Sequence, residues 1–151
     1  MSIESYHSYL TEESAANLRA EADNILAHDP EEKLTWWYDL SKPPSNIIEN
    51  YIMKSAQQHG LDGYLGAEWW IRSHDDINSQ WYFHVDGDVD RFRETGEYLA
   101  APFCTVTYLS DGGQPTVVCD QHHDWLKTDS IYITGDDDWT LWSYPKMGKH
   151  I

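Results

Sequence analysis

A change of pattern near residue 60 constrains the fold of this chain more than any other feature. Before Gly60, apolar residues recur at helical spacing; after it, short β-branched and aromatic runs alternate with Asp- and Gly-rich turns. Helices followed by an all-β segment are typical of an α+β domain in which the helices cover one face of a β-sandwich. The sequence predicts one domain over 1–151, helical over about 1–60 and β over about 61–151.

Two helices are predicted in the first part. The first covers 11–28, where Leu10 and Thr11 precede first-turn acids and apolar residues follow at intervals of three and four. A short aromatic segment at 36–38 then leads into a proline turn. The second helix starts near Ser45 and ends at His59-Gly60, since glycine suits the position after a helix.

Strands are predicted in the second part, where turn residues separate the apolar runs. The predicted strands lie near 64–72, 79–85, 103–109, 115–119, 129–134 and 138–144. The turn at 110–113, Ser-Asp-Gly-Gly, predicts a hairpin between the third and fourth of these.

The composition excludes several classes of partner. The net charge is −16, and no basic stripe is present to neutralise phosphates, so nucleic acid and anionic membranes are poor partners. The sequence has no signal-peptide pattern and no apolar stretch near the roughly 18 residues of a membrane span, so we expect a cytoplasmic protein. Cys104 and Cys119 are too few for a disulfide scaffold and are expected to be buried free thiols.

A metal-binding pattern recurs in the sequence. Histidine and aspartate two apart on a strand face the same side, so both can bind one ion. The chain has three such pairs, where chance predicts about one, so spacing alone does not choose among them. They are His74/Asp76, His84/Asp86 and His122/Asp124. The first and last lie in polar, turn-like stretches, whereas His84/Asp86 ends the aromatic run 80–83, which favours it as a rigid site.

Four strings together resemble a known family. They are Ala67-Glu68-Trp69-Trp70, Phe83-His84-Val85-Asp86-Gly87-Asp88, the run from Ala101 through Thr107-Tyr108-Leu109 to Asp111, and Gln114-Pro115-Thr116-Val117-Val118. Their order and spacing resemble Fe(II)/2-oxoglutarate-dependent oxygenases over roughly residues 64–151. The resemblance implies an antiparallel double-stranded β-helix core, of the jelly-roll or cupin-like kind, with the N-terminal helices packed on it.

The resemblance also implies roles for individual residues. His84 and Asp86 match the first two Fe(II) ligands and are the expected catalytic pair. Tyr108 matches a position that often hydrogen-bonds the cosubstrate 2-oxoglutarate, although core packing is an equal alternative. Glu68, Trp69 and Trp70 would line or support the cavity, with core packing favoured for the two tryptophans.

The C-terminal sequence departs from this family. Residues 144–151 match the turn that leads toward the distal His ligand and the cosubstrate-binding Arg, but neither residue follows. His150 is the candidate third ligand although it comes earlier than the family position, while His122 and His123 would need an unusual arrangement. The implied β-helix lacks its last strands, so we expect a homodimer or a complementing chain to cover the open edge. A natural two-chain enzyme, a truncated product and a degenerate relative all fit this pattern.

Two functions follow as expectations. The first is a hydroxylase, or a subunit of one, that uses Fe(II) and 2-oxoglutarate to oxidise a small-molecule or peptide substrate. The second is a non-catalytic binding or assembly protein that keeps the fold without the reaction.

Overall fold

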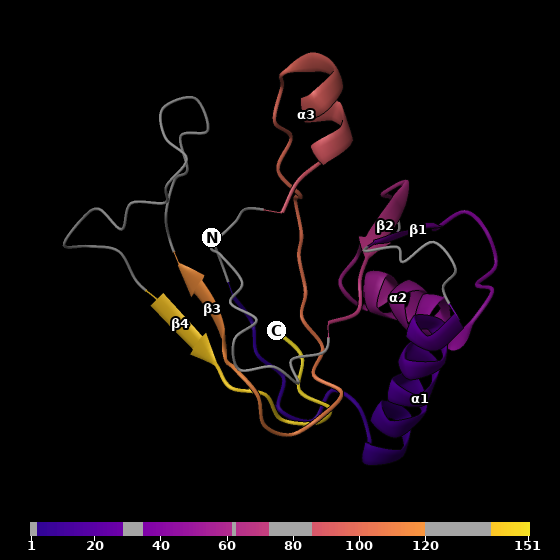
Figure 1. Cartoon of the computed structure of the whole chain (residues 1–151), viewed down its shortest axis with the longest axis vertical. Helices are drawn as coiled ribbons and strands as arrows, with labels where there is room; N and C mark the ends of the chain where they lie inside the picture. The colour runs from indigo at the N-terminus through magenta and orange to yellow at the C-terminus, as the bar shows by residue number, and fades with distance from the viewer. Residues whose placement is uncertain (1–2, 29–34, 62, 73–85, 120–139) are drawn as a thin grey trace. The chain divides into compact units, whose positions relative to one another are not determined.

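The computed structural model describes residues 3–28, 35–61, 63–72, 86–119 and 140–151. The elements, in order, are α1 (Glu12–His28), β1 (Trp36–Asp39), α2 (Ile47–Gln58), β2 (Gly66–Trp69), α3 (Val89–Thr95), β3 (Thr116–Cys119) and β4 (Thr140–Ser143) (Figure 1). They group into two compact units. The helical unit is Leu10–Ser73, and the β unit combines Met1–Tyr9 with His74–Ile151.

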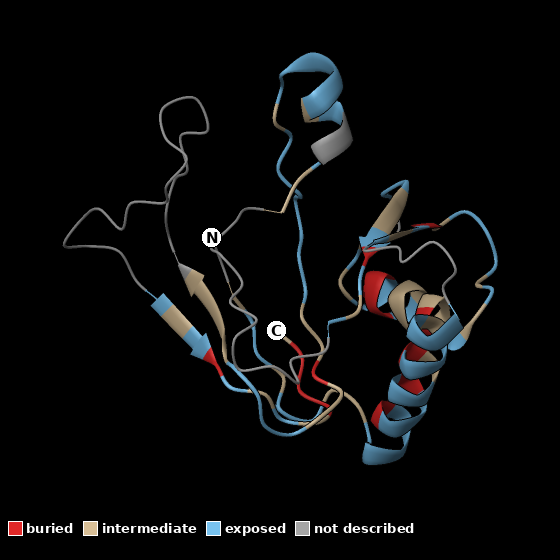
Figure 2. Ribbon diagram, viewed as in Figure 1, coloured by how far each residue is buried: buried red, intermediate tan, exposed pale blue. Residues whose placement is uncertain are grey.

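Helix α1 begins at its predicted cap. The Oγ1 atom of Thr11 accepts a hydrogen bond from the backbone N–H of Ser14 at 3.1 Å, which satisfies a donor that the first turn leaves open. The buried residues of α1 recur every three or four positions and form one stripe along the helix (Figure 2); they are Ala15, Leu18 and Ala22. The helix predicted over 11–28 is confirmed.

Helix α2 is capped at both ends. Asn46 Oδ1 accepts from the N–H of Glu49 at 2.9 Å, and the Glu49 carboxylate accepts from the backbone and hydroxyl of Ser45, each at 2.6 Å. At the other end His59 is the C-cap, and Gly60 follows with a φ of 68°, a left-handed conformation that favours glycine. The second predicted helix is confirmed, starting two residues after Ser45.

Strands β1 and β2 form an antiparallel pair within the helical unit. Trp36 lies opposite Trp69, and Asp39 lies opposite Gly66. The two indoles stack with ring centroids 4.8 Å apart and planes 21° apart. The strand predicted at 64–72 is therefore present in a shorter form, and the aromatic segment predicted at 36–38 is its partner strand.

Strands β3 and β4 form the second antiparallel pair, in the β unit. Thr116 pairs with Ser143, and Cys119 pairs with Thr140. These strands correspond to the predictions at 115–119 and 138–144. The turn at 112–113 has the expected left-handed glycines, with φ of 77° and 104°.

The C-terminal residues lie in the centre of a third antiparallel arrangement. The backbones of Val106 and Ile151 exchange two hydrogen bonds of 2.9 and 3.0 Å, and those of Tyr6 and His150 exchange two of 2.8 and 3.0 Å. Segment 148–151 thus lies between Tyr6 and segment 106–108. The predicted hairpin partner of 103–109 is wrong, because this segment pairs with the chain end while β3 pairs with β4.

The fold is a mixture of helix and antiparallel sheet, as the α+β prediction states. Within the described residues the named strands form two two-stranded sheets, and a double-stranded β-helix is not among the elements found. Predicted strands 79–85 and 129–134 lie outside the described residues. Helix α3 occupies a stretch for which the sequence pattern predicted no helix.

Candidate metal and cosubstrate site

The backbone around Asp86 is held in a short antiparallel ladder. The carbonyl oxygen of Asp86 accepts from the N–H of Ala101 at 2.8 Å, and the N–H of Asp88 donates to Leu99 at 2.9 Å. Gly87 lies between them, and a Cβ atom there would collide with the Tyr98 ring and stand 2.7 Å from the Leu99 carbonyl oxygen. Close packing therefore requires glycine at the middle position of the Asp-Gly-Asp sequence.

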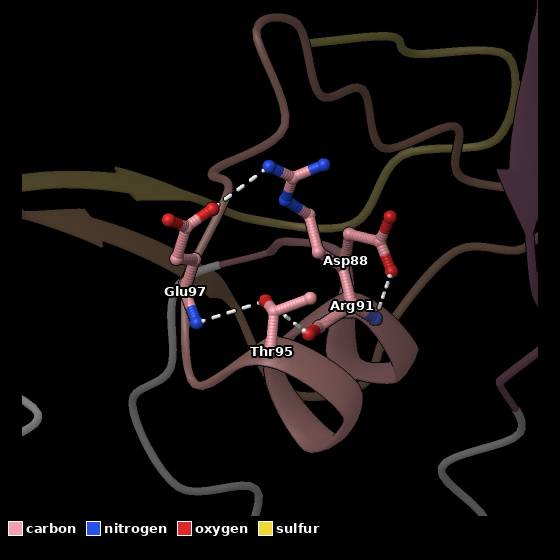
Figure 3. A network of polar contacts seen from close by, with 4 residues as sticks. All are labelled: Asp88, Arg91, Thr95 and Glu97. Carbon is pink, nitrogen blue, oxygen red and sulfur yellow. Dashed lines mark hydrogen bonds and ion pairs between the residues drawn. The ribbon is translucent and has the colours of Figure 1, made fainter.

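Helix α3 connects the two paired segments of this ladder. Its polar contacts are shown in Figure 3. Asp88 caps the helix, because its Oδ1 accepts from the N–H of Arg91 at 2.8 Å. The Thr95 hydroxyl donates to the Arg91 carbonyl oxygen at 2.8 Å and accepts from the N–H of Glu97 at 3.1 Å. Arg91 and Glu97 form an ion pair of 2.9 Å. Asp88 thus serves the helix as a cap.

The Asp86 carboxylate lies beside two other ionisable groups. Desolvation raises the pKa of the Cys104 thiol to about 12, and the charge of Asp86 and a hydrogen bond to it add to this shift. The thiol pKa reflects packing around the sulfur. Cys104 is a free cysteine, as expected, but the residue is exposed, so the prediction that it is buried is wrong; the side chain of Cys119 lies outside the description. Desolvation, followed by the charge of Asp86, also raises the pKa of Tyr98. The Asp86 carboxylate is therefore close to the Cys104 thiol and the Tyr98 hydroxyl, and Asp86 as a residue is half-buried.

His150 lies elsewhere in the β unit, among aromatic residues. Its side chain is 1% exposed, and its Nδ1 is 2.7 Å from the Thr107 hydroxyl. Its ring stacks on that of Tyr9, with centroids 4.3 Å apart and planes 15° apart, and the Tyr6 ring lies 6.4 Å away. One ring nitrogen of the candidate third ligand is thus occupied by a hydrogen bond within the fold.

Tyr108 is buried, and its hydroxyl forms a hydrogen bond within the β unit. The hydroxyl donates to the carbonyl oxygen of Ser143, at the end of β4, at 2.8 Å. The amino group of Lys149 lies 5.7 Å from the Tyr108 ring centroid. The hydroxyl proton that could have donated to 2-oxoglutarate therefore forms a hydrogen bond that links segment 106–108 to β4.

The donors present fit an Fe(II) site in part. Asp86 carries an oxygen donor of the kind that non-haem iron uses, and His84 lies outside the described residues. Within the described part of the chain, no three His, Cys, Asp or Glu side chains are close enough together to hold one ion. The structure brings Asp86 together with Tyr98 and Cys104 and places His150 against Thr107. The rival pairs His74/Asp76 and His122/Asp124 also lie outside the described residues.

The aromatic residues expected near a cavity belong to the helical unit. Trp69 is 9% exposed and, with Trp36, lines a half-open hollow of about 430 Å³. Trp70 and Glu68 are exposed. Core packing, favoured for both tryptophans, is confirmed for Trp69, which is stacked and buried, and is wrong for Trp70, which is 38% exposed.

The sequence pattern did not single out Tyr98 or Lys149, and it gave Cys104 no role beyond that of a buried thiol. Tyr98 and Cys104 adjoin Asp86, and Lys149 is buried beside Tyr108. Only the alternation of the strand-like run 103–109 could have placed Cys104 and Tyr108 on one face. Lys149 carried no local signal, since a lysine near a chain end is ordinarily exposed.

No protein family, curated protein or solved structure was found to match this chain. None of the helices in the described residues is long and apolar enough to cross a membrane.

Proposed function

We propose that this chain is an Fe(II)/2-oxoglutarate-dependent oxygenase, or a subunit of one, in which His84 and Asp86 supply two of the metal ligands. The observation that carries the proposal is the placement of Asp86. The Asp86 carbonyl oxygen accepts from the N–H of Ala101, and Asp86 as a residue is half-buried. A carboxylate on a backbone-paired, half-buried residue, two positions after a histidine, suits a facial-triad ligand.

The bound iron, with O₂ and 2-oxoglutarate, would supply the oxidising chemistry that hydroxylates a small-molecule or peptide substrate. The residues around it have more limited tasks. Asp86 would hold a charged oxygen toward the ion, while the Cys104 thiol and Tyr98 would shield that oxygen from water. Helix α3 and its capping contacts would keep the turn after Asp86 in place.

The fold we propose is the double-stranded β-helix. The antiparallel pairing of β3 with β4, and of segment 106–108 with segment 148–151, supports it. Both pairings join segments far apart in the chain, as such a core requires.

Metal binding by the metal-free protein tests the proposal. Under anaerobic conditions, equilibrium dialysis should give one Fe(II) per chain, with affinity at least about tenfold lower for His84→Ala and for Asp86→Asn. Asp111→Asn is the matched control, because it removes a carboxylate whose contacts are to Met147 and Lys146. Equal Fe(II) affinity in the wild type and in both site variants would refute the proposal.

A non-catalytic binding or assembly role is the second candidate, and one observation favours it. The Nδ1 of His150 is occupied by Thr107, and the ring is stacked on Tyr9. If this histidine is purely structural, the third ligand must come from another part of the chain or from a partner. Retention of the fold without Fe(II) binding would support this second function.

A further inference from the structure

The half-open hollow in the helical unit is lined by a concentration of tryptophan. Its volume of about 430 Å³ lies within the range of small-molecule binding sites, roughly 300–1,000 Å³. Three of the eight tryptophans of the chain contribute to its lining, namely Trp36, Trp37 and Trp69. The described lining residues all belong to the unit Leu10–Ser73, so the hollow is built within one compact part of the chain.

The pairing of β1 with β2 positions these indoles. Trp36 stacks on Trp69, with ring centroids 4.8 Å apart, and Trp69 is 9% exposed. The Trp37 ring lies against the backbone at Gly66, where an added Cβ atom would collide with it. Trp37 as a residue is still 62% exposed, so much of its ring surface is open to a ligand.

The charge of the lining is negative. Among the described residues that line the hollow, Glu49 is the one with an ionisable side chain. Its Oε2 atom accepts from the backbone N–H and the hydroxyl of Ser45, each at 2.6 Å, which fixes the carboxylate at the start of α2. Because a carboxylate has two oxygens with about four acceptor positions, Glu49 can serve the helix cap and a ligand together.

Aromatic walls and a carboxylate together favour a cationic ligand. The face of an aromatic ring attracts cations, and tryptophan does so most strongly. Glu49 would oppose an anion and would add nothing to the binding of a neutral apolar molecule. The net charge of −16 also draws cations toward the chain.

We propose that this hollow binds a small organic cation that carries an alkylated ammonium group, with Trp36, Trp37 and Trp69 as its walls and Glu49 as its counter-charge. A bare ammonium is strongly hydrated, whereas alkyl groups on the nitrogen gain from apolar contact with the indoles. The site requires neither iron nor 2-oxoglutarate, so the inference is independent of the proposed oxygenase function.

Titration of the chain with choline at constant ionic strength tests the inference. Calorimetry gives the Kd, and tryptophan emission gives a signal from the indoles themselves. The matched probe is the neutral alcohol in which a carbon atom replaces the choline nitrogen, because it keeps the shape and loses the charge. Choline should bind at least about tenfold more tightly than this alcohol.

Two pairs of variants locate the site. Glu49→Gln should raise the Kd for choline about fivefold or more, and glutamine can keep the acceptor position in the helix cap. Glu13→Gln is its control, since it removes the same charge from an exposed residue outside the lining, and its Kd should stay within about twofold of the wild type. Trp37→Leu should raise the Kd about threefold or more, whereas Trp142→Leu, at an exposed indole of the β unit, should not.

Four results would overturn the inference. The first three are no saturable binding of choline to the wild type, equal affinity for choline and the alcohol, and Kd values in Glu49→Gln and Trp37→Leu no higher than in their controls. The fourth is binding to phosphatidylcholine vesicles without binding of free choline, because the headgroup would then be recognised on a lipid surface. If one variant fails to fold, the other decides. Since no iron is added, failure here leaves the proposal for His84 and Asp86 untouched.

Discussion

At the scale of single residues, Tyr108 shows how one side chain can fit two roles. Its position in the sequence resembles a cosubstrate-binding tyrosine, and its structure shows a buried hydroxyl that donates to the carbonyl oxygen of Ser143 at 2.8 Å. The hydroxyl oxygen can still accept a hydrogen bond, but its proton is used. The structural role is therefore established at this residue, and the binding role remains a prediction.

Tyr108→Phe separates these roles. Loss of the hydroxyl leaves the buried carbonyl oxygen of Ser143 without this donor, so the free energy of unfolding should fall by about 1–3 kcal/mol. Urea denaturation measures this change, and Tyr144→Phe, at an exposed ring, is the control. An unchanged stability together with a large loss of 2-oxoglutarate affinity would instead make Tyr108 a binding residue.

Asp111 provides a pH-dependent contribution to stability. Its hydrogen bond from the N–H of Met147, followed by its contacts with Lys146, lowers the pKa of the carboxyl below its ordinary value of 3.8. A group whose pKa is lower in the folded state stabilises the fold above its unfolded pKa and loses that contribution as the pH falls through its folded pKa. The contribution should therefore be complete at neutral pH, begin to decrease near about pH 4 and be lost as the pH falls through the lower pKa of the folded state.

The prediction is tested with Asp111→Asn. The variant should be less stable than the wild type near neutral pH, and the difference should shrink as the pH falls toward about 3. Denaturant midpoints across this range measure it. A difference that stays constant with pH would show that the carboxylate charge contributes nothing.

At the scale of elements, the helices were predictable because their signals are local. Thr11 and Gly60 mark helix ends that the structure confirms, and the cap of α2 is Asn46, one residue after the predicted start near Ser45. Asp88 and Gly96 give the same signals for α3, but a seven-residue helix leaves too short an apolar pattern to detect. Strand partners were harder, since the pairing of 106–108 with 148–151 depends on contacts some 40 residues apart, which no local pattern contains.

Gly66 is a specific requirement of the β1–β2 pair. A Cβ atom there would collide with the Trp37 ring and lie 2.5 Å from the carbonyl oxygen of Tyr38, which is backbone and cannot move aside cheaply. Gly66→Ala should lower the free energy of unfolding by about 1–3 kcal/mol. Gly63→Ala is the matched control, because no heavy atom lies within 4 Å of its added Cβ. Equal stabilities of the two variants would contradict this packing.

At the scale of the whole molecule, residues near both ends of the sequence belong to one unit. Tyr6 and segment 106–108 flank segment 148–151 through backbone hydrogen bonds, and His150 is 1% exposed between them. Terminal residues usually have few contacts, but residues 148–150 are buried. Their backbone partners lie about 40 and 140 positions away in the sequence.

Deletion of residues 1–9 tests this arrangement. Without Tyr6 and Tyr9, one edge of segment 148–151 and one face of the His150 ring lose their contacts. Backbone amides at 106–108 and 148–151 should exchange with solvent faster, by at least about tenfold, while those of α2 serve as the internal reference. Unchanged exchange at 148–151 would contradict the arrangement.

The proposed metal ligands are His84, inferred from the sequence alone, and Asp86, whose surroundings the structure describes. The site should bind Fe(II) and 2-oxoglutarate together, because the cosubstrate completes the coordination of an ion that the protein leaves open. The most direct measurement is anaerobic addition of 2-oxoglutarate to the Fe(II)-loaded chain, recording the weak visible charge-transfer band of the iron chelate. A band that appears in the wild type and is absent in His84→Ala and Asp86→Asn is the predicted result. Its absence in the wild type, under conditions where the chain is folded and loaded with Fe(II), would contradict an oxygenase site in this protein.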